Sequence, residues 1–337
     1  MTIDVSLPSV LRSHKDLSQR LSNLVSIAGV PRPSDLPLKA LPRTQHYSLV
    51  GSAFDYLFRF EVQRRNPLAR TEDWVAEAAV KLLKPVEFQG GGTIREWPGV
   101  EGVEALSVEA EGILNQARAA HQLYLRIKNP SGEQVAHMAL HTLRLAKLDV
   151  IYRAEILDPS LGSTDALDVE DLVQLWNTLS FDGPLSICLD KGVRLNPTFG
   201  SYSVGFRGTD AGLIAGTKLI DIETTIKPDV RPGLAQLLGY TMAADTYRLH
   251  ENQEFPRVES IALYFARQGR LVSFPMQPIR GHSDYVAAFE ALMQYCHTAP
   301  PSLGAPVRRM FSSGLRRPRN QAPKRVSGSR KKRPPKR

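Results

Sequence analysis

Apolar side chains recur at helical spacing through most of the chain before residue 180. A helix is predicted to begin near Gly51, because Ala53, Phe54 and Leu57 give it a broad apolar face. A second clear start is Asp168, which is a suitable N-cap for the apolar positions that follow it. The same period predicts further helices over residues 72–83, 103–125, 133–152 and 168–179, and a short amphipathic segment lies around residues 17–27.

Beyond residue 180 the pattern changes to short apolar runs and to alternation of apolar and polar positions, which is typical of strands. Gly216 and the pair Gln268-Gly269 mark turns between neighbouring strands. This order of elements indicates an α/β or α+β fold with one central sheet. Strands are predicted over residues 184–194, 204–215, 218–226, 258–266 and 271–274, and helices over 232–249 and 283–296.

The segment from Lys218 to Ile226 is the most informative for chemistry. Side chains alternate along a strand, so Leu219, Asp221 and Glu223 share one face, with the two carboxylates about 7 Å apart. Asp210 lies on the predicted strand before it and reaches the same face if the two strands pair. Three converging carboxylates repel unless a cation joins them, and Mg²⁺ or Mn²⁺ suits such ligands. The alternative is a half-exposed strand with polar residues facing solvent.

Three stretches in this order resemble the RecB-type branch of the PD-(D/E)XK nucleases. That branch has an Asp on one strand, D-x-K on the next and Q-x-x-x-Y on the following helix, with G-x-x-x-H on an early helix. The resemblance implies a restriction-endonuclease-like fold, in which a mixed sheet is flanked by helices. The matching segments are 205–214 (GFRGTDAGLI), 219–225 (LIDIETT) and 236–240 (QLLGY), with 51–55 (GSAFD) in the place of the early helix.

The resemblance also assigns roles. It implies that Asp210, Asp221 and Glu223 bind Mg²⁺ or Mn²⁺, with Glu223 as a ligand or as the base for water. It implies a further metal contact from Asp55, and an orienting role for Gln236 and Tyr240 on one helix face. The candidate catalytic residues of a metal-dependent DNA nuclease are therefore Asp210, Asp221, Glu223, Gln236 and Tyr240.

Two departures from the family pattern leave other functions open. Glu223 stands where the family has Lys, and Asp55 stands where many members have His. A Glu binds a metal or acts as a base but supplies no positive charge. The alternatives are a catalytically silent nuclease-fold module that binds DNA or serves as a scaffold, and a domain whose residues 46–180 bind a protein partner.

Charge and composition divide the chain into four predicted parts: a Pro-rich strap (1–45), a helical region (46–180), the nuclease-like core (181–300) and a disordered basic tail (301–337). Of the 43 Lys and Arg residues, 13 lie in 307–337, which has no Asp or Glu, so the rest carries 30 basic against 34 acidic side chains. Such a tail binds phosphate backbones without sequence specificity. Its candidate DNA contacts are Arg316, Arg317, Arg319, Lys324, Arg325, Arg330, Lys331, Lys332 and Arg333.

The cysteine content and the hydropathy bear on the compartment. Cys188 and Cys296 are too few for a disulfide framework or a four-cysteine zinc site, which favours a reducing interior. No stretch has the roughly 18–20 apolar residues of a membrane span, and the N-terminus lacks the apolar run of a signal peptide. A cytoplasmic protein without a membrane segment is therefore expected.

Overall fold

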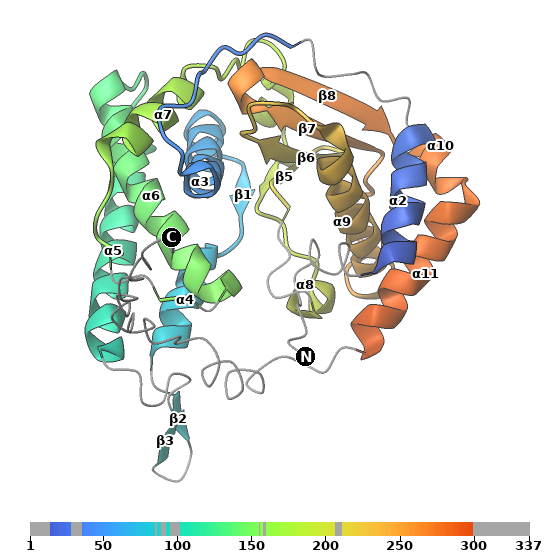
Figure 1. Ribbon diagram of the computed structural model, residues 1–337, viewed down its shortest axis with the longest axis horizontal. Coiled ribbons are helices and arrows are strands. Elements are labelled where there is room, and N and C mark those ends of the chain that lie inside the picture. The colour runs from blue at the N-terminus through green and yellow to red at the C-terminus, as the bar shows by residue number, and fades with distance from the viewer. Residues whose placement is uncertain are drawn as a thin grey trace, which may run out of the picture.

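A six-stranded mixed sheet with helices on both faces forms the centre of the protein (Figure 1). The computed structural model describes residues 14–27, 36–84, 86–88, 92–94, 102–154, 156–157, 160–205 and 211–298. The predicted sheet flanked by helices is thereby confirmed. The strands of this sheet are β1 (Arg70–Thr71), β4 (Arg194–Leu195), β5 (Leu213–Ala215), β6 (Lys218–Glu223), β7 (Ser260–Phe265) and β8 (Arg270–Pro275), in that spatial order.

The strand directions follow from the lengths of the connections. β4, β5 and β6 pair antiparallel, and the β5–β6 turn contains Gly216 at φ 60°. β6 and β7 pair parallel, because α9 (Val230–His250) carries the chain back to the starting end of the sheet. β7 and β8 form the predicted hairpin, with Gly269 at φ 59°. β2 (Val86–Phe88) and β3 (Gly92–Ile94) form a separate antiparallel pair.

Helices occupy the positions that the apolar period indicates, with ends shifted by a few residues. Among these described helices, none is long and apolar enough to cross a bilayer. The remaining helices are α2 (Lys15–Ile27), α3 (Tyr47–Arg65), α4 (Val75–Leu83), α5 (Val103–Tyr124), α6 (Gly132–Ala154), α7 (Ala166–Trp176), α8 (Ser201–Gly205), α10 (Gln277–Arg280) and α11 (Ser283–Thr298), with short 3₁₀ turns η2 (Ser186–Leu189) and η3 (Ala266–Gln268).

Three local predictions are wrong. Residues 184–194 form η2 and a loop rather than a strand, and only Arg194 begins β4. Leu185 and Cys188 are both buried, and this spacing of three is the period of a 3₁₀ turn. The predicted strand 204–215 contains the end of α8 and the short β5, with 206–210 outside the described residues. The N-cap of α7 is Asp165, whose side chain accepts a 2.8 Å bond from Leu167 N, and Asp168 lies inside the helix.

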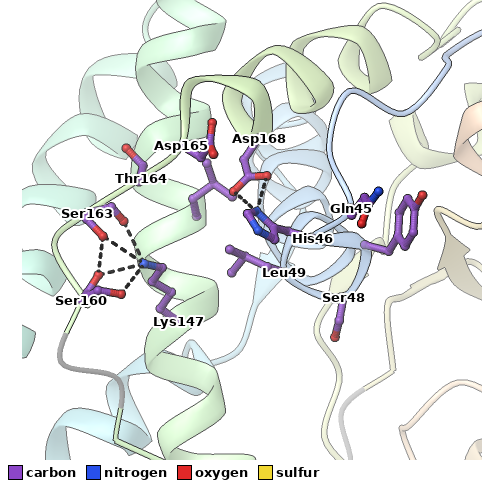
Figure 2. A pocket seen from close by; sticks show the side chains of 12 residues that line it. Gln45, His46, Ser48, Leu49, Lys147, Ser160, Ser163, Thr164, Asp165 and Asp168 are labelled. Atoms are coloured by element: carbon purple, nitrogen blue, oxygen red, sulfur yellow. Dashed lines mark hydrogen bonds and ion pairs between the residues drawn. The ribbon is translucent and has the colours of Figure 1, made fainter.

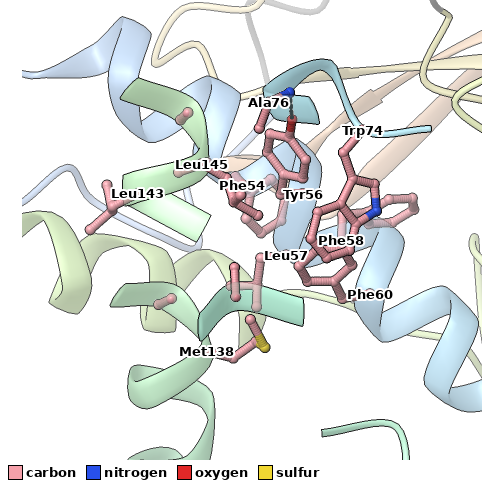
Figure 3. Close-up of a cluster of buried hydrophobic side chains, with 14 of the residues drawn as sticks. Phe54, Tyr56, Leu57, Phe58, Phe60, Trp74, Ala76, Met138, Leu143 and Leu145 are labelled. Atoms are coloured by element: carbon pink, nitrogen blue, oxygen red, sulfur yellow. Dashed lines mark hydrogen bonds between the residues drawn. The ribbon is translucent and has the colours of Figure 1, made fainter. Parts of the chain in front are cut away.

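The sheet separates two apolar cores, and β6 contributes to both. Leu219 packs with residues of α9 and α2, whereas Ile220 packs with the core of α3 to α7. In Figure 1 the first group of helices lies to the right of the sheet and the second to the left. On the α3 side the core is rich in aromatic rings, and Phe60 and Tyr56 lie 5.0 and 6.3 Å from Trp74 between ring centroids (Figure 3). The predicted alternation is confirmed over residues 218–223, and β6 ends before the predicted strand end at residue 226.

Candidate functional site

The end of β6 opens into a cavity of about 260 Å³ between α3, α6 and α9. Five of the residues singled out from the sequence line it, although they come from three separate elements. They are joined there by two residues of α6 that sequence reasoning did not find. The lining consists of Gly51, Ser52 and Asp55 from α3, Asp149 and Arg153 from α6, Ala211 and Gly212 before β5, Asp221, Ile222 and Glu223 from β6, and Gln236 and Tyr240 from α9.

Side chains of α9 contact the carboxylate of Asp221. Gln236 Nε2 donates to Tyr240 OH over 2.7 Å and lies 3.4 Å from Asp221 Oδ2. Asp221 Oδ1 accepts from the backbone N–H of Ile222 over 3.0 Å. Gln236 and Tyr240 are four residues apart, so both face the sheet from one side of the helix. The structure therefore brings Asp221 and the Q-x-x-x-Y pair together.

Two glycines let the flanking helices approach the end of β6. A Cβ on Gly51 of α3 would lie 3.0 Å from Thr224 Oγ1. A Cβ on Gly233 of α9 would lie 2.9 Å from Glu223 Oε1 and 2.8 Å from Leu263 Cδ2. The contacts at Gly233 are shorter than side-chain packing tolerates, so a larger residue there would move α9, Leu263 or the Glu223 carboxylate. The contact at Gly51 is tight, so a larger residue there would require the Thr224 side chain or α3 to shift.

The wall formed by α3 and α6 is a linked set of polar groups that hold one another in place. Arg59 pairs with Asp55 over 2.6 Å, and its guanidinium lies 4.6 Å from the centroid of the Tyr56 ring. Tyr56 OH accepts from Ala76 N and donates to Asp149 Oδ1 over 2.7 Å. Burial raises the pKa of Tyr56 well above its ordinary value, so the hydroxyl remains a donor. Arg59 and Tyr56 therefore hold the carboxylates of Asp55 and Asp149 in place.

Glu223 is a carboxylate of the cavity whose pKa is shifted. Its burial, and next the charge of nearby Asp229, raise its pKa to about 7. A carboxylate that titrates near neutral pH is poised to accept a proton or to bind a cation, and perturbed groups of this kind cluster at functional sites.

No family model, curated protein or solved structure matches this chain.

The donor set fits a hard divalent cation in its chemistry. Asp55, Asp149, Asp221 and Glu223 all line the cavity, and carboxylate oxygens are the ligands that Mg²⁺ and Mn²⁺ prefer. Within the part of the chain that the structure describes, no three Asp, Glu, His or Cys side chains group closely enough to hold a metal by themselves. Mg²⁺ is often held by one or two carboxylates with waters and substrate phosphates.

Other predicted site residues fall outside the described residues. Asp210 is one, although Ala211 and Gly212, which follow it in sequence, line the cavity. A Cβ on Gly212 would lie 2.8 Å from Ile220 O, so this position admits no side chain without moving β6. The nine candidate DNA contacts between Arg316 and Arg333 also lie outside the described residues.

A second cavity, of about 530 Å³, lies between α3, α6 and the segment before α7 (Figure 2). Its charged side chains form hydrogen bonds within the protein. His46 Nδ1 lies 3.0 Å from Asp168 Oδ1, and Lys147 Nζ donates to the carbonyls of Ser160 and Ser163 over 2.8 and 3.0 Å. These bonds fasten the start of α3 to α7 and the loop at 160–163 to α6, and we assign this cavity a structural role.

Replacing Glu223 by Gln is expected to change how the stability of the metal-free protein depends on pH. The folded-state pKa of Glu223 lies above its unfolded value, so its contribution to stability is complete below about pH 4 and is lost as pH rises through 7. Glu223→Gln should match wild type at pH 4 and exceed it by about 2–3 kcal/mol at pH 8. Urea unfolding in EDTA across this range measures the difference. Equal pH profiles would show that Glu223 is ionised in the folded protein at neutral pH.

Proposed function

We propose that this chain is a divalent-metal-dependent nuclease that hydrolyses phosphodiester bonds in DNA. One observation carries the proposal: Asp55, Asp221, Glu223, Gln236 and Tyr240, which occupy positions of the RecB-like pattern, all line one cavity. The proposal includes the restriction-endonuclease-like form of the fold. The antiparallel β4-β5-β6 meander followed by α9 and the parallel strand β7 supports it.

In this proposal Asp210 and Asp221 hold one or two Mg²⁺ or Mn²⁺ ions, with Glu223 as a further ligand or as the base for water. When bound, the metal polarises the scissile phosphate and lowers the pKa of water. Hydrolysis forms a bond between a water oxygen and phosphorus and breaks the bond to one ester oxygen. The water loses a proton, which ionised Glu223 accepts where it acts as the base, and the leaving alkoxide gains a proton from solvent.

The residues on α9 and α3 have positioning roles. Gln236, which is hydrogen-bonded to Tyr240, donates to Asp221 Oδ2 and so orients that carboxylate. Arg59 fixes Asp55, which restricts that carboxylate to one orientation at the rim of the cavity. A preorganised ligand set of this kind avoids reorganisation when substrate binds.

A second candidate function is a catalytically silent nuclease-fold module that binds DNA. The observation in its favour is the 2.6 Å ion pair between Arg59 and Asp55, which already neutralises the carboxylate in the place of the family His. Glu223, which stands where the family has Lys, also favours the silent module.

Incubation of purified protein with linear, circular and single-stranded DNA tests both candidates. Each substrate is combined with Mg²⁺, Mn²⁺ or EDTA. Cleavage that requires the metal supports the nuclease. DNA binding without cleavage under any of these conditions leaves the silent module. Absence of both binding and cleavage removes both proposals.

Deletion of residues 307–337 is expected to weaken DNA binding about tenfold or more at 0.1 M salt and to flatten its salt dependence, because fewer counterions are released. The melting temperature should stay unchanged. A full-length control in which the nine basic residues between 316 and 333 become Gln should behave like the deletion. Fluorescence anisotropy with a labelled duplex measures both effects, and unchanged affinity would show that the tail does not contact DNA.

A further inference from the structure

The lining of the cavity at the end of β6 has more acidic than basic side chains. Four carboxylates line it, on Asp55, Asp149, Asp221 and Glu223. Among the described lining residues, Arg153 is the only one with a cationic side chain. A cavity that receives a phosphodiester needs positive charge where negative charge develops, and carboxylates supply none.

The element that carries this arginine is separate from the RecB-like pattern. Arg153 lies in the last turn of α6, where the helix dipole favours a cation. One turn earlier, Asp149 is buried with 6% of its surface exposed and accepts a hydrogen bond from Tyr56 OH. Residues four apart share one helix face, so the anchoring of Asp149 also fixes the direction from which Arg153 enters the cavity. Arg153 itself is exposed in this last turn of α6.

The family's lysine is absent from β6, where Glu223 occupies its place. We propose that Arg153 supplies from α6 the positive charge that the family's lysine supplies from the strand. Its guanidinium donates to a non-bridging oxygen of the scissile phosphate and stabilises the charge that develops there. The planar fork of arginine suits two parallel bonds to phosphate. This inference rests on the proposed nuclease function.

The test compares Arg153→Ala and Arg153→Lys with wild type in steady-state cleavage of DNA with Mg²⁺. Arg153→Ala should lower kcat about 100-fold or more, which is the usual effect of removing one preorganised donor, and Arg153→Lys should keep part of the activity. Added guanidinium ion, at concentrations well below those that unfold the protein, should restore activity to Arg153→Ala. The matched control is Arg126→Ala, because Arg126 is also exposed and does not line the cavity.

A second measurement separates this role from metal binding. Mn²⁺ binding to Arg153→Ala, followed by electron paramagnetic resonance, should equal or exceed that of wild type, because a positive charge has been removed from beside the carboxylates. Weaker Mn²⁺ binding would make Arg153 a group that organises the metal ligands and would overturn the inference.

The cleavage assays also separate failure of this inference from failure of the proposed nuclease function. If wild type cleaves DNA and Arg153→Ala cleaves equally well, the inference fails and the proposed nuclease function stands. A loss of activity that guanidinium does not restore, together with a lower melting temperature, would assign Arg153 a structural role. If wild type cleaves no DNA with either metal, the proposed function itself fails, and the inference fails with it.

Discussion

Asp221→Asn is expected to abolish metal-dependent DNA cleavage, with a loss of about 1,000-fold or more, and to remove Mn²⁺ binding at the same time. A neutral amide is a much poorer ligand than a carboxylate for a hard cation. The substitution is otherwise mild, since the Asn oxygen can still accept from the backbone N–H of Ile222. Cleavage assays and titration with Mn²⁺ measure the two losses.

Stability measurements distinguish this chemical effect from unfolding. In EDTA, Asp221→Asn should be as stable as wild type or more stable, because it removes one of several carboxylates that repel across a partly dry cavity. Asp182→Asn is the control, since Asp182 is exposed and lies outside the cavity lining. Asp221→Asn protein that cleaves DNA at the wild-type rate would place the metal elsewhere and would contradict the proposed site.

The sequence correctly predicted relations between residues of the same helix or strand. Period-two alternation along residues 218–223 separates Leu219 from Ile220, and the structure places these two residues in different cores. The spacing of Gln236 and Tyr240 sets them on one helix face, where their side chains meet. In each case the backbone geometry of a single element is enough to relate the residues.

What the sequence did not indicate depends on packing between elements. Asp149 and Arg153 are single polar positions on a mostly buried helix, and nothing in their own neighbourhood shows that α6 lies against α3 at the cavity. The error at 184–194 has a similar origin, because a short apolar run does not by itself show which of its residues are buried, and in the structure Leu185 and Cys188 are buried at the spacing of a 3₁₀ turn. The division of the chain at residues 45, 180 and 300 stays a prediction.

Arg267→Met is expected to lower the free energy of unfolding by about 3–5 kcal/mol, because it leaves a buried carboxylate without its partner. Arg267 is 1% exposed and forms a bidentate pair with Asp171 Oδ1 and Oδ2 over 2.8 and 2.9 Å. Asp171 is fully buried in α7, so water cannot replace the guanidinium. Chemical denaturation measures the change. Arg118→Met, which breaks an exposed pair with Glu77, is the control and should cost less than about 1 kcal/mol.

Arg267 also contacts the end of β6, next to the candidate site. Arg267 Nε donates over 2.7 Å to the carbonyl of Thr224, the residue that follows Glu223. The double variant Arg267→Met/Asp171→Leu removes both buried charges and should recover most of the lost stability. It does not restore the bond to Thr224, so the end of β6 stays less constrained and cleavage should remain well below wild type. Recovery of stability and cleavage together would show that the Thr224 contact does not position Glu223.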